Sequence, residues 1–95
     1  MPCFSCNIVN LIPYCSLSGR ELERLDVQLL NRMPLLEVMN VSDNCLKSMP
    51  SNLELKMLKK LDCSENELSD ISFLETLTSL RELNMDGNFL DVSSV

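Results

Sequence analysis

The feature that most constrains this chain is an eleven-residue motif that recurs at a fixed interval. It appears as LEVMNVSDNCL at 36–46, LKKLDCSENEL at 58–68 and LRELNMDGNFL at 80–90. Each copy reads L-x-x-L-x-L-x-x-N-x-L, with Met, Val or Cys in place of leucine at some inner positions. Successive copies are offset by 22 residues, and unrelated sequence rarely keeps one register three times. We therefore expect the chain to stack similar coils.

A weaker copy of the motif, IPYCSLSGREL, precedes these three at 12–22. Arg20 occupies its asparagine position, and the interval to Asn44 is longer, at 24 residues. Terminal repeats often depart from the consensus because one of their faces has no neighbouring repeat. We therefore interpret this segment as the start of the first coil.

The longer interval is filled by the segment ELERLDVQLLNRM at 21–33, in which apolar residues follow helical spacing. The spacing predicts a short helix on the convex side. It should end before Pro34, because the residue preceding a proline avoids helical backbone angles. The apolar stripe of this helix comprises Leu22, Leu25, Leu29, Leu30 and Met33.

The alternation of apolar and polar residues inside each copy predicts a short β-strand whose apolar side chains face a core. Stacked coils of this kind form an α/β fold, a leucine-rich-repeat solenoid with a short parallel sheet on its concave face. Short helices or turns are expected on the convex face. In the third coil, the spacing of Phe73 and Leu77 predicts a helical turn, whereas MPSN at 49–52 predicts an irregular second coil.

The asparagine at the ninth motif position is expected to stabilise the turn after each strand. Its side chain has two amide donors and an acceptor, so when buried it can bond backbone groups of its own and adjacent coils. The residues of this predicted asparagine ladder are Asn44, Asn66 and Asn88.

The motif register also predicts the domain organisation. An N-terminal segment at 1–11 does not match the motif, and the repeat domain is expected at 12–95. The expected coils are 12–35, 36–57, 58–79 and a truncated coil at 80–95.

Polar side chains between the apolar strand positions are expected to point to solvent along the concave face. Mixed charge with few aromatic residues suits a selective surface for a protein partner, although the same side chains could serve only to solubilise the domain. Lys59, Lys60 and Arg81 form one basic cluster on an otherwise acidic face. Solenoids usually bind through such surfaces, which favours use of the face for binding. The candidate concave binding face comprises Glu37, Val38, Asn40, Ser42, Lys59, Lys60, Asp62, Ser64, Arg81, Glu82, Asn84 and Asp86.

The charge balance and the missing residue types exclude several functions. The chain carries 8 Lys and Arg against 14 Asp and Glu, which disfavours direct binding to nucleic acid or to an anionic membrane. It contains no histidine, so no Ser–His or Cys–His nucleophilic pair can form. Asp43, Glu65 and Asp86 are expected near one another, but on a solvated face that does not separate their pKa values. We expect no enzyme activity and no cofactor.

Five cysteines, an odd number, and the lack of a basic segment before the apolar stretch near the start favour a reducing, intracellular compartment. No run approaches the roughly 20 apolar residues of a transmembrane helix. Cys3 and Cys6 have metal-ligand spacing, but zinc usually needs four ligands and no second pair follows. Cys15 and Cys63 are expected to point inward, while Cys45 lies in a variable motif position. We expect no bound metal.

Details beyond the leucines point to a family. They are LSGREL at 17–22, LDVQLLNR at 25–32, SDNCL at 42–46, PSNLEL at 50–55, and Cys63 at an inner strand position. These runs closely resemble the N-terminal repeats of the vertebrate leucine-rich-repeat and WD-repeat proteins associated with the origin recognition complex. The resemblance implies a nuclear, chromatin-associated scaffold that supports loading of that complex and heterochromatin organisation. Its implied partners are origin recognition complex or chromatin proteins.

The resemblance spans residues 16–90, which leaves out the WD-repeat propeller of that family. Functions that rest on the propeller are therefore not carried over to this chain. The unmatched start and the abrupt end at Val95 lead us to expect a fragment of a longer protein.

Two other functions remain open from the sequence. The even 22-residue spacing also suits a phosphatase-regulator-like subunit whose concave face grips an enzyme. An extracellular receptor fragment would instead place Cys3, Cys6 and Cys15 in a disulfide cap, and a measurement of free thiols would separate that alternative from the intracellular ones.

Overall fold

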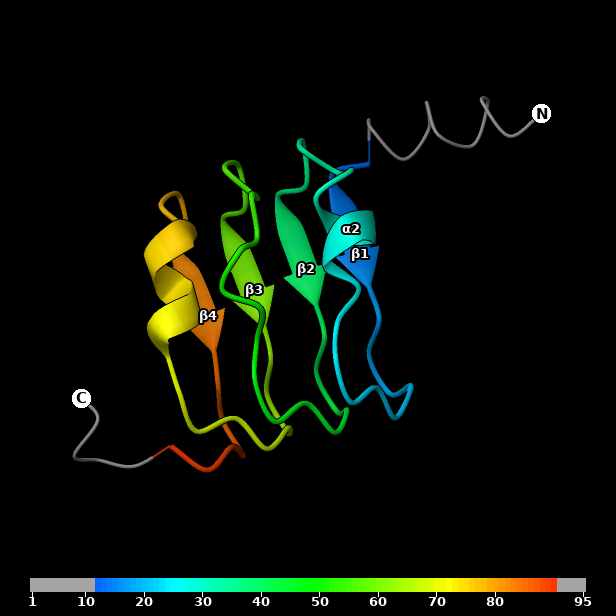
Figure 1. Ribbon diagram of the computed structural model, residues 1–95, viewed down its shortest axis with the longest axis vertical. Helices are drawn as coiled ribbons and strands as arrows, with labels where there is room; N and C mark the ends of the chain where they lie inside the picture. Colours follow the sequence, from blue (N-terminus) through cyan, green and yellow to red (C-terminus); the bar gives the residue numbers. More distant parts are fainter. Residues whose placement is uncertain (1–11, 91–95) are drawn as a thin grey trace.

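The computed structural model describes residues 12–90 as a single sheet with short segments of helix in front of it (Figure 1). The sheet is parallel, and its strands follow the order β1-β2-β3-β4 of the sequence. The strands are β1 (Tyr14–Ser16), β2 (Val38–Asn40), β3 (Lys60–Asp62) and β4 (Glu82–Asn84). This arrangement confirms the predicted leucine-rich-repeat solenoid.

The pairing register reproduces the intervals of the sequence motif. Tyr14 lies opposite Val38, Val38 opposite Lys60, and Lys60 opposite Glu82. Equal motif positions therefore become neighbours across the sheet, even where the first interval is two residues longer. The extra residues are accommodated outside the sheet, on the convex side, and leave the strand register unchanged.

The middle residue of each strand points into the core, and its exposure shows where the core is closed. Met39 and Leu61 are 0% and 1% exposed, whereas Cys15 is half-buried. Leu83, at the same position of β4, is 40% exposed. The two central coils therefore cover each other, while β4 has no strand on its other side among residues 12–90.

The predicted short helix is present on the convex side. Helix α2 spans only Val27–Leu30 and begins where the Asp26 carboxylate accepts a bond from the Leu29 N–H. Such a side-chain cap fixes a helix start. Leu25, Leu30 and Met33 of the predicted apolar stripe are buried as expected. Leu29, which the spacing also placed in that stripe, is 38% exposed. The helix does end before Pro34.

The other two coils differ on the convex side as their sequences indicated. A 3-10 helix, η1 (Ser72–Thr76, yellow in Figure 1), forms the predicted helical turn, with Phe73 only 2% exposed. No helix forms between Lys47 and Met57, so the second coil is irregular there. Direct links join the convex segments: Asn31 Nδ2 donates to the Asn52 carbonyl, and its Oδ1 accepts from the Glu54 N–H.

The Asn66 side chain bonds two coils at once. Its Nδ2 lies 3.1 Å from the carbonyl oxygens of Cys63 and Ser64 in its own coil, and 3.0 Å from that of Val41 in the preceding one. Two hydrogens serve three carbonyls, so one hydrogen is shared. Its Oδ1 accepts from the Leu46 N–H at 3.0 Å. Asn66 is 4% exposed, so its amide depends on these contacts for its hydrogen bonds.

Asn44 and Asn88 repeat the arrangement in their coils. Asn44 Oδ1 accepts from the Arg20 and Leu22 N–H groups, and its Nδ2 reaches back to the Leu17 carbonyl at 3.0 Å. Arg20, which replaces the asparagine of the first coil, is thus bonded through its backbone. Asn88 donates to the Cys63 carbonyl at 2.9 Å but is only half-buried.

The residue before each ladder position adopts left-handed backbone angles. Gly19, Asp43, Glu65 and Gly87 have φ of +65°, +59°, +55° and +72°. Glycine meets no steric cost there, aspartate tolerates the region, and glutamate is strained by it. The Glu65 carboxylate also lies over Gly87, where a Cβ atom would be only 2.6 Å from it. Gly87 is thus constrained chiefly by its backbone angles, since the exposed Glu65 side chain can move aside.

We predict that Asn66→Ala lowers the free energy of unfolding by about 1–3 kcal/mol, because it leaves buried backbone groups unsatisfied. Asn88→Ala should cost less, since Asn88 is half-buried and water can replace some of its bonds. Thermal and urea melts of both variants measure the difference. Equal and negligible losses at the two sites would contradict the stabilising role of the ladder.

We also predict that Gly87→Ala destabilises the chain slightly more than Gly19→Ala. Both lose the freedom to adopt positive φ, at about 1–2 kcal/mol. Only the Gly87 substitution also displaces a neighbour, because nothing lies within 4 Å of a Cβ at Gly19. Adding Glu65→Ala should bring the two losses closer together in urea melts. If the added substitution leaves the gap unchanged, the Glu65 contact has no energetic weight.

Candidate functional site

The sheet presents two columns of side chains that point away from the core. One column crosses the strands through Val38, Lys60 and Glu82, and the other through Asn40, Asp62 and Asn84. Neighbouring strands in a sheet lie about 4.8 Å apart, so each column forms a continuous line of contacts for a partner. None of the twelve candidate residues of the concave face is buried.

Tyr14 extends the first column, and the sequence analysis missed it. Its ring is 54% exposed and lies opposite the half-buried Val38. The two side chains give the β1–β2 end of the face an apolar, aromatic character, while Lys60 and Glu82 make the other end charged. Tyr14 occupies the same place in IPYCSL as Val38 in LEVMNV, and that alignment could have identified it.

The basic cluster predicted on this face is partly neutralised. Lys59 Nζ lies 3.8 Å from Glu37 Oε1, with both side chains nearly half exposed. An exposed pair of this kind contributes little to stability, so Lys59 remains available to a partner at small cost. Lys60 and Arg81 are exposed and have no ion pair of 4.0 Å or less among residues 12–90.

The second column has a structural role that spacing alone did not reveal. The Oδ1 atoms of Asn40, Asp62 and Asn84 each accept the backbone N–H two residues later, at 2.9, 3.1 and 3.0 Å. These side chains turn the chain out of each strand in the manner of Asx turns. Their remaining polar atoms still face solvent, but substitutions there would disturb the turns as well as a binding surface.

A shallow depression of about 320 Å³ lies between β3 and β4. It is lined by Lys60, Leu61, Asp62, Glu82, Leu83 and Asn84. Lys60 and Glu82 lie at the start of the two strands, and Asp62 and Asn84 lie at their end. A partner side chain that carries both a positive and an apolar part matches this lining chemically.

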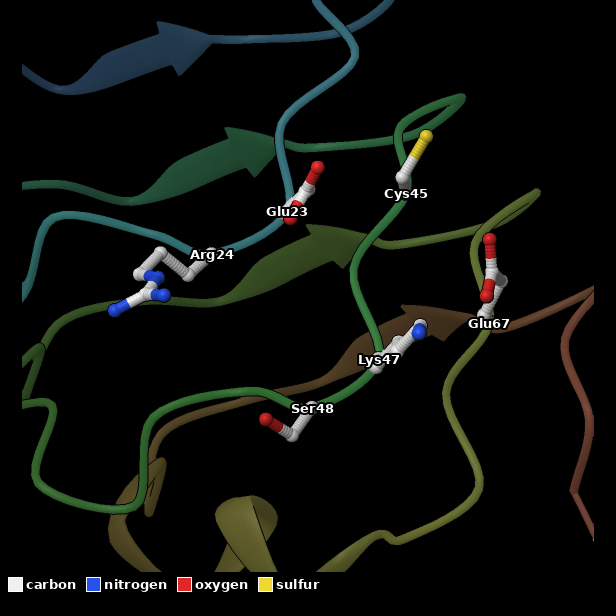
Figure 2. A pocket seen from close by; sticks show the side chains of 6 residues that line it. All are labelled: Glu23, Arg24, Cys45, Lys47, Ser48 and Glu67. Atoms are coloured by element: carbon white, nitrogen blue, oxygen red, sulfur yellow. The ribbon is translucent and has the colours of Figure 1, made fainter.

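A larger groove of about 630 Å³ lies at the loops that follow the ladder, where three coils meet (Figure 2). Glu23 comes from the first coil, Cys45 and Lys47 from the second, and Glu67 from the third. Carboxylates, cations and a thiol occur together there, and Arg24 and Ser48 complete the lining. The lining is therefore polar and carries charges of both signs.

The described cysteines are free thiols, and two of them are chemically quiet. Burial, with a smaller contribution from the Asp62 carboxylate, raises the pKa of the Cys63 thiol to about 12. Burial also raises the pKa of Cys15, against an opposing effect of Arg20. Both thiols are therefore protonated at neutral pH and poor nucleophiles. Cys45 is half-buried, and Cys3 and Cys6 lie outside the described residues.

The acidic residues noted in the sequence lie in adjoining turns, all exposed to solvent. The Asp43 N–H donates to the Ser64 carbonyl, and the Glu65 N–H to the Asp86 carbonyl. Within residues 12–90, no three His, Cys, Asp or Glu side chains are grouped closely enough to hold a metal ion. In the same described part, no helix has the length and apolar character needed to cross a membrane.

The chain is similar in sequence to known leucine-rich-repeat proteins. Leucine-rich repeat and WD repeat-containing protein 1 of mouse is 43% identical over 81 residues, which cover 82% of this chain and 12% of the mouse protein. The zebrafish protein of the same name is 42% identical over 66 residues, covering 70% and 9%. The human protein is 43% identical over 58 residues, covering 59% and 9%. The chain thus spans about a tenth of the length of these relatives.

The family comparison covers nearly the whole chain. The repeat family described as "Leucine-rich repeat and WD repeat-containing protein 1, LRR" matches residues 6–95, so the match begins before the first strand. Both the repeat register and the inner Cys63 lie within the matched region. The chain therefore belongs to the family of the leucine-rich-repeat region of leucine-rich repeat and WD repeat-containing protein 1.

Proposed function

We propose that this chain is a non-enzymatic scaffold that binds a protein partner on the concave face of its sheet. The observation that carries the proposal is the first column, in which Tyr14, Val38, Lys60 and Glu82 lie in register with no buried member. Aromatic residues supply most of the energy in many interfaces, while charged residues set specificity and association rate. The first column contains both an aromatic residue, Tyr14, and charged residues, Lys60 and Glu82.

Membership of the repeat family suggests which kind of protein this chain binds. We infer that the chain acts within a nuclear, chromatin-associated protein that supports loading of the origin recognition complex and heterochromatin organisation. Membership of the repeat family supports this inference. The net charge of −6 favours a protein surface over DNA as the direct contact, because binding to phosphates needs clustered cations.

The test is a binding assay between the purified chain and purified origin recognition complex, with nucleosomes as a second partner. The proposal expects saturable binding that does not require DNA. Absence of binding to both partners would exclude the chromatin role for this chain, while the fold and the concave face would remain to be tested with other proteins.

We predict that reversing Lys59, Lys60 and Arg81 to Glu weakens partner binding by about tenfold or more, because these cations attract an acidic segment. The variant should keep its circular-dichroism spectrum, since all three side chains are exposed. Glu75→Lys, on the exposed convex side of η1, is the control and should be nearly silent. If Glu75 matters and the basic cluster does not, the concave face is not the binding site.

We predict separately that Tyr14→Ala weakens the same binding by about tenfold, because it removes the exposed aromatic ring of the face. Tyr14→Phe should retain most of the affinity if the ring contact dominates. The matched control is Phe89→Ala, which removes another highly exposed ring outside the concave column. Isothermal titration calorimetry distinguishes the three variants, and equal losses from Tyr14→Ala and Phe89→Ala would argue against a special role for Tyr14.

A further inference from the structure

The depression between β3 and β4 opens on the concave face, between two strands that are hydrogen-bonded to each other. It lies within the sheet, so it does not depend on what lies beside the other edge of β4. The outward side chains of its lining are Lys60, Asp62, Glu82 and Asn84. The inference below rests on the proposed use of the concave face and concerns the chemistry of the partner at this depression.

Asp62 carries a charge that its structural role does not need. Its Oδ1 accepts from the Ser64 N–H at 3.1 Å and from the Ser64 hydroxyl at 2.7 Å. Asn40 and Asn84 make the same turn in the neighbouring coils with a neutral amide, at 2.9 and 3.0 Å. Among residues 12–90, Oδ2 of Asp62 accepts no hydrogen bond. One carboxylate oxygen therefore remains for a donor from a partner.

The other end of the depression holds two opposite charges that are not joined. Lys60 and Glu82 lie opposite each other across β3 and β4, and both are exposed. Within residues 12–90, neither forms an ion pair of 4.0 Å or less. Asp62 lies two residues beyond Lys60, about 6.6 Å along the strand. A cation from a partner is therefore attracted to the end of the strands, and an anion to Lys60 at their start.

We infer that the partner places an arginine side chain in this depression and an acidic side chain on Lys60. The guanidinium donates to Asp62 Oδ2 and to Asn84 Oδ1, which keeps a second lone pair beside the one that accepts the Asp86 N–H. Its planar fork can serve oxygens on two neighbouring strands, which lie about 4.8 Å apart. The aliphatic stem lies against the strands between the outward side chains.

The spacing of Lys60 and Asp62 defines the segment that carries both charges. Side chains two residues apart in an extended segment share one face and are separated by about 6.6 Å, as in β3 itself. A segment that contains Glu-x-Arg or Arg-x-Glu therefore places each charge on its counterpart. The order of the two residues sets the direction in which the segment lies along β3. A uniformly acidic segment matches only one of the two ends.

NMR titration of the isotope-labelled 95-residue chain with Ac-Ala-Glu-Ala-Arg-Ala-NH2 and with Ac-Ala-Arg-Ala-Glu-Ala-NH2 tests the inference. With at least one of them, the amide signals of Asp62, Ser64 and Asn84 should shift and saturate at millimolar concentration. The same peptide with lysine in place of arginine, or with glutamate at both charged positions, should bind about threefold more weakly or less tightly still. Equal binding of the peptide with two glutamates would overturn the inference.

Asp62→Asn is the decisive variant, because it removes the charge and keeps the acceptor of the turn, as Asn40 and Asn84 do. It should weaken binding of the arginine peptide by about threefold or more, with an unchanged circular-dichroism spectrum. Asp43→Asn is the matched control, since it removes an exposed carboxylate from a neighbouring turn outside the depression. Equal affinities of the two variants, or signal shifts confined to other strands, would also overturn the inference.

The binding assay with purified origin recognition complex separates this inference from the proposed function. A complex that binds the unchanged chain, and loses affinity with the reversed basic cluster but not with Asp62→Asn, would exclude the arginine contact and leave the concave face as the binding site. A complex that does not bind would count against the chromatin role alone, because the peptide titration decides the arginine contact independently.

Discussion

The structure depends on one repeated interaction, the bonding of a buried asparagine amide to the turns of two successive coils. A turn that runs through a protein interior has carbonyl and N–H groups that water cannot reach, and each needs a partner. The amide of Asn66 supplies both donor and acceptor, and it reaches the Val41 carbonyl as well as its own coil. The asparagine side chain thereby links each turn to the turn of the preceding coil.

The ladder also determines where the functional side chains lie. Because each asparagine follows its strand by the same number of residues, it holds Val38, Lys60 and Glu82 at equal heights on the sheet. The polar columns of the concave face are a consequence of this register. Recognition can therefore vary from protein to protein by substitution at the outward positions, while the inward positions and the asparagines maintain the stack.

Sequence reasoning predicted the fold and the strand register well, because both follow from a pattern that is local and repeated. It failed where tertiary contacts override local spacing. The apolar stripe begins at Leu22, but the helix is capped only at Asp26 and Leu29 remains exposed. The bridge from Asn31 to the next coil is another such contact, since its partners lie more than twenty residues away. Tyr14 was missed because the first coil matches the motif poorly.

A solenoid built by translation leaves its terminal coils with one uncovered face, which a closed fold does not. Every coil presents on one side the groups that the next coil requires, so the number of satisfied interfaces is always one fewer than the number of coils. In the central coils, Met39 and Leu61 are fully covered, whereas the equivalent Leu83 is not. The same rule that extends a binding surface one strand at a time also creates an edge at its end.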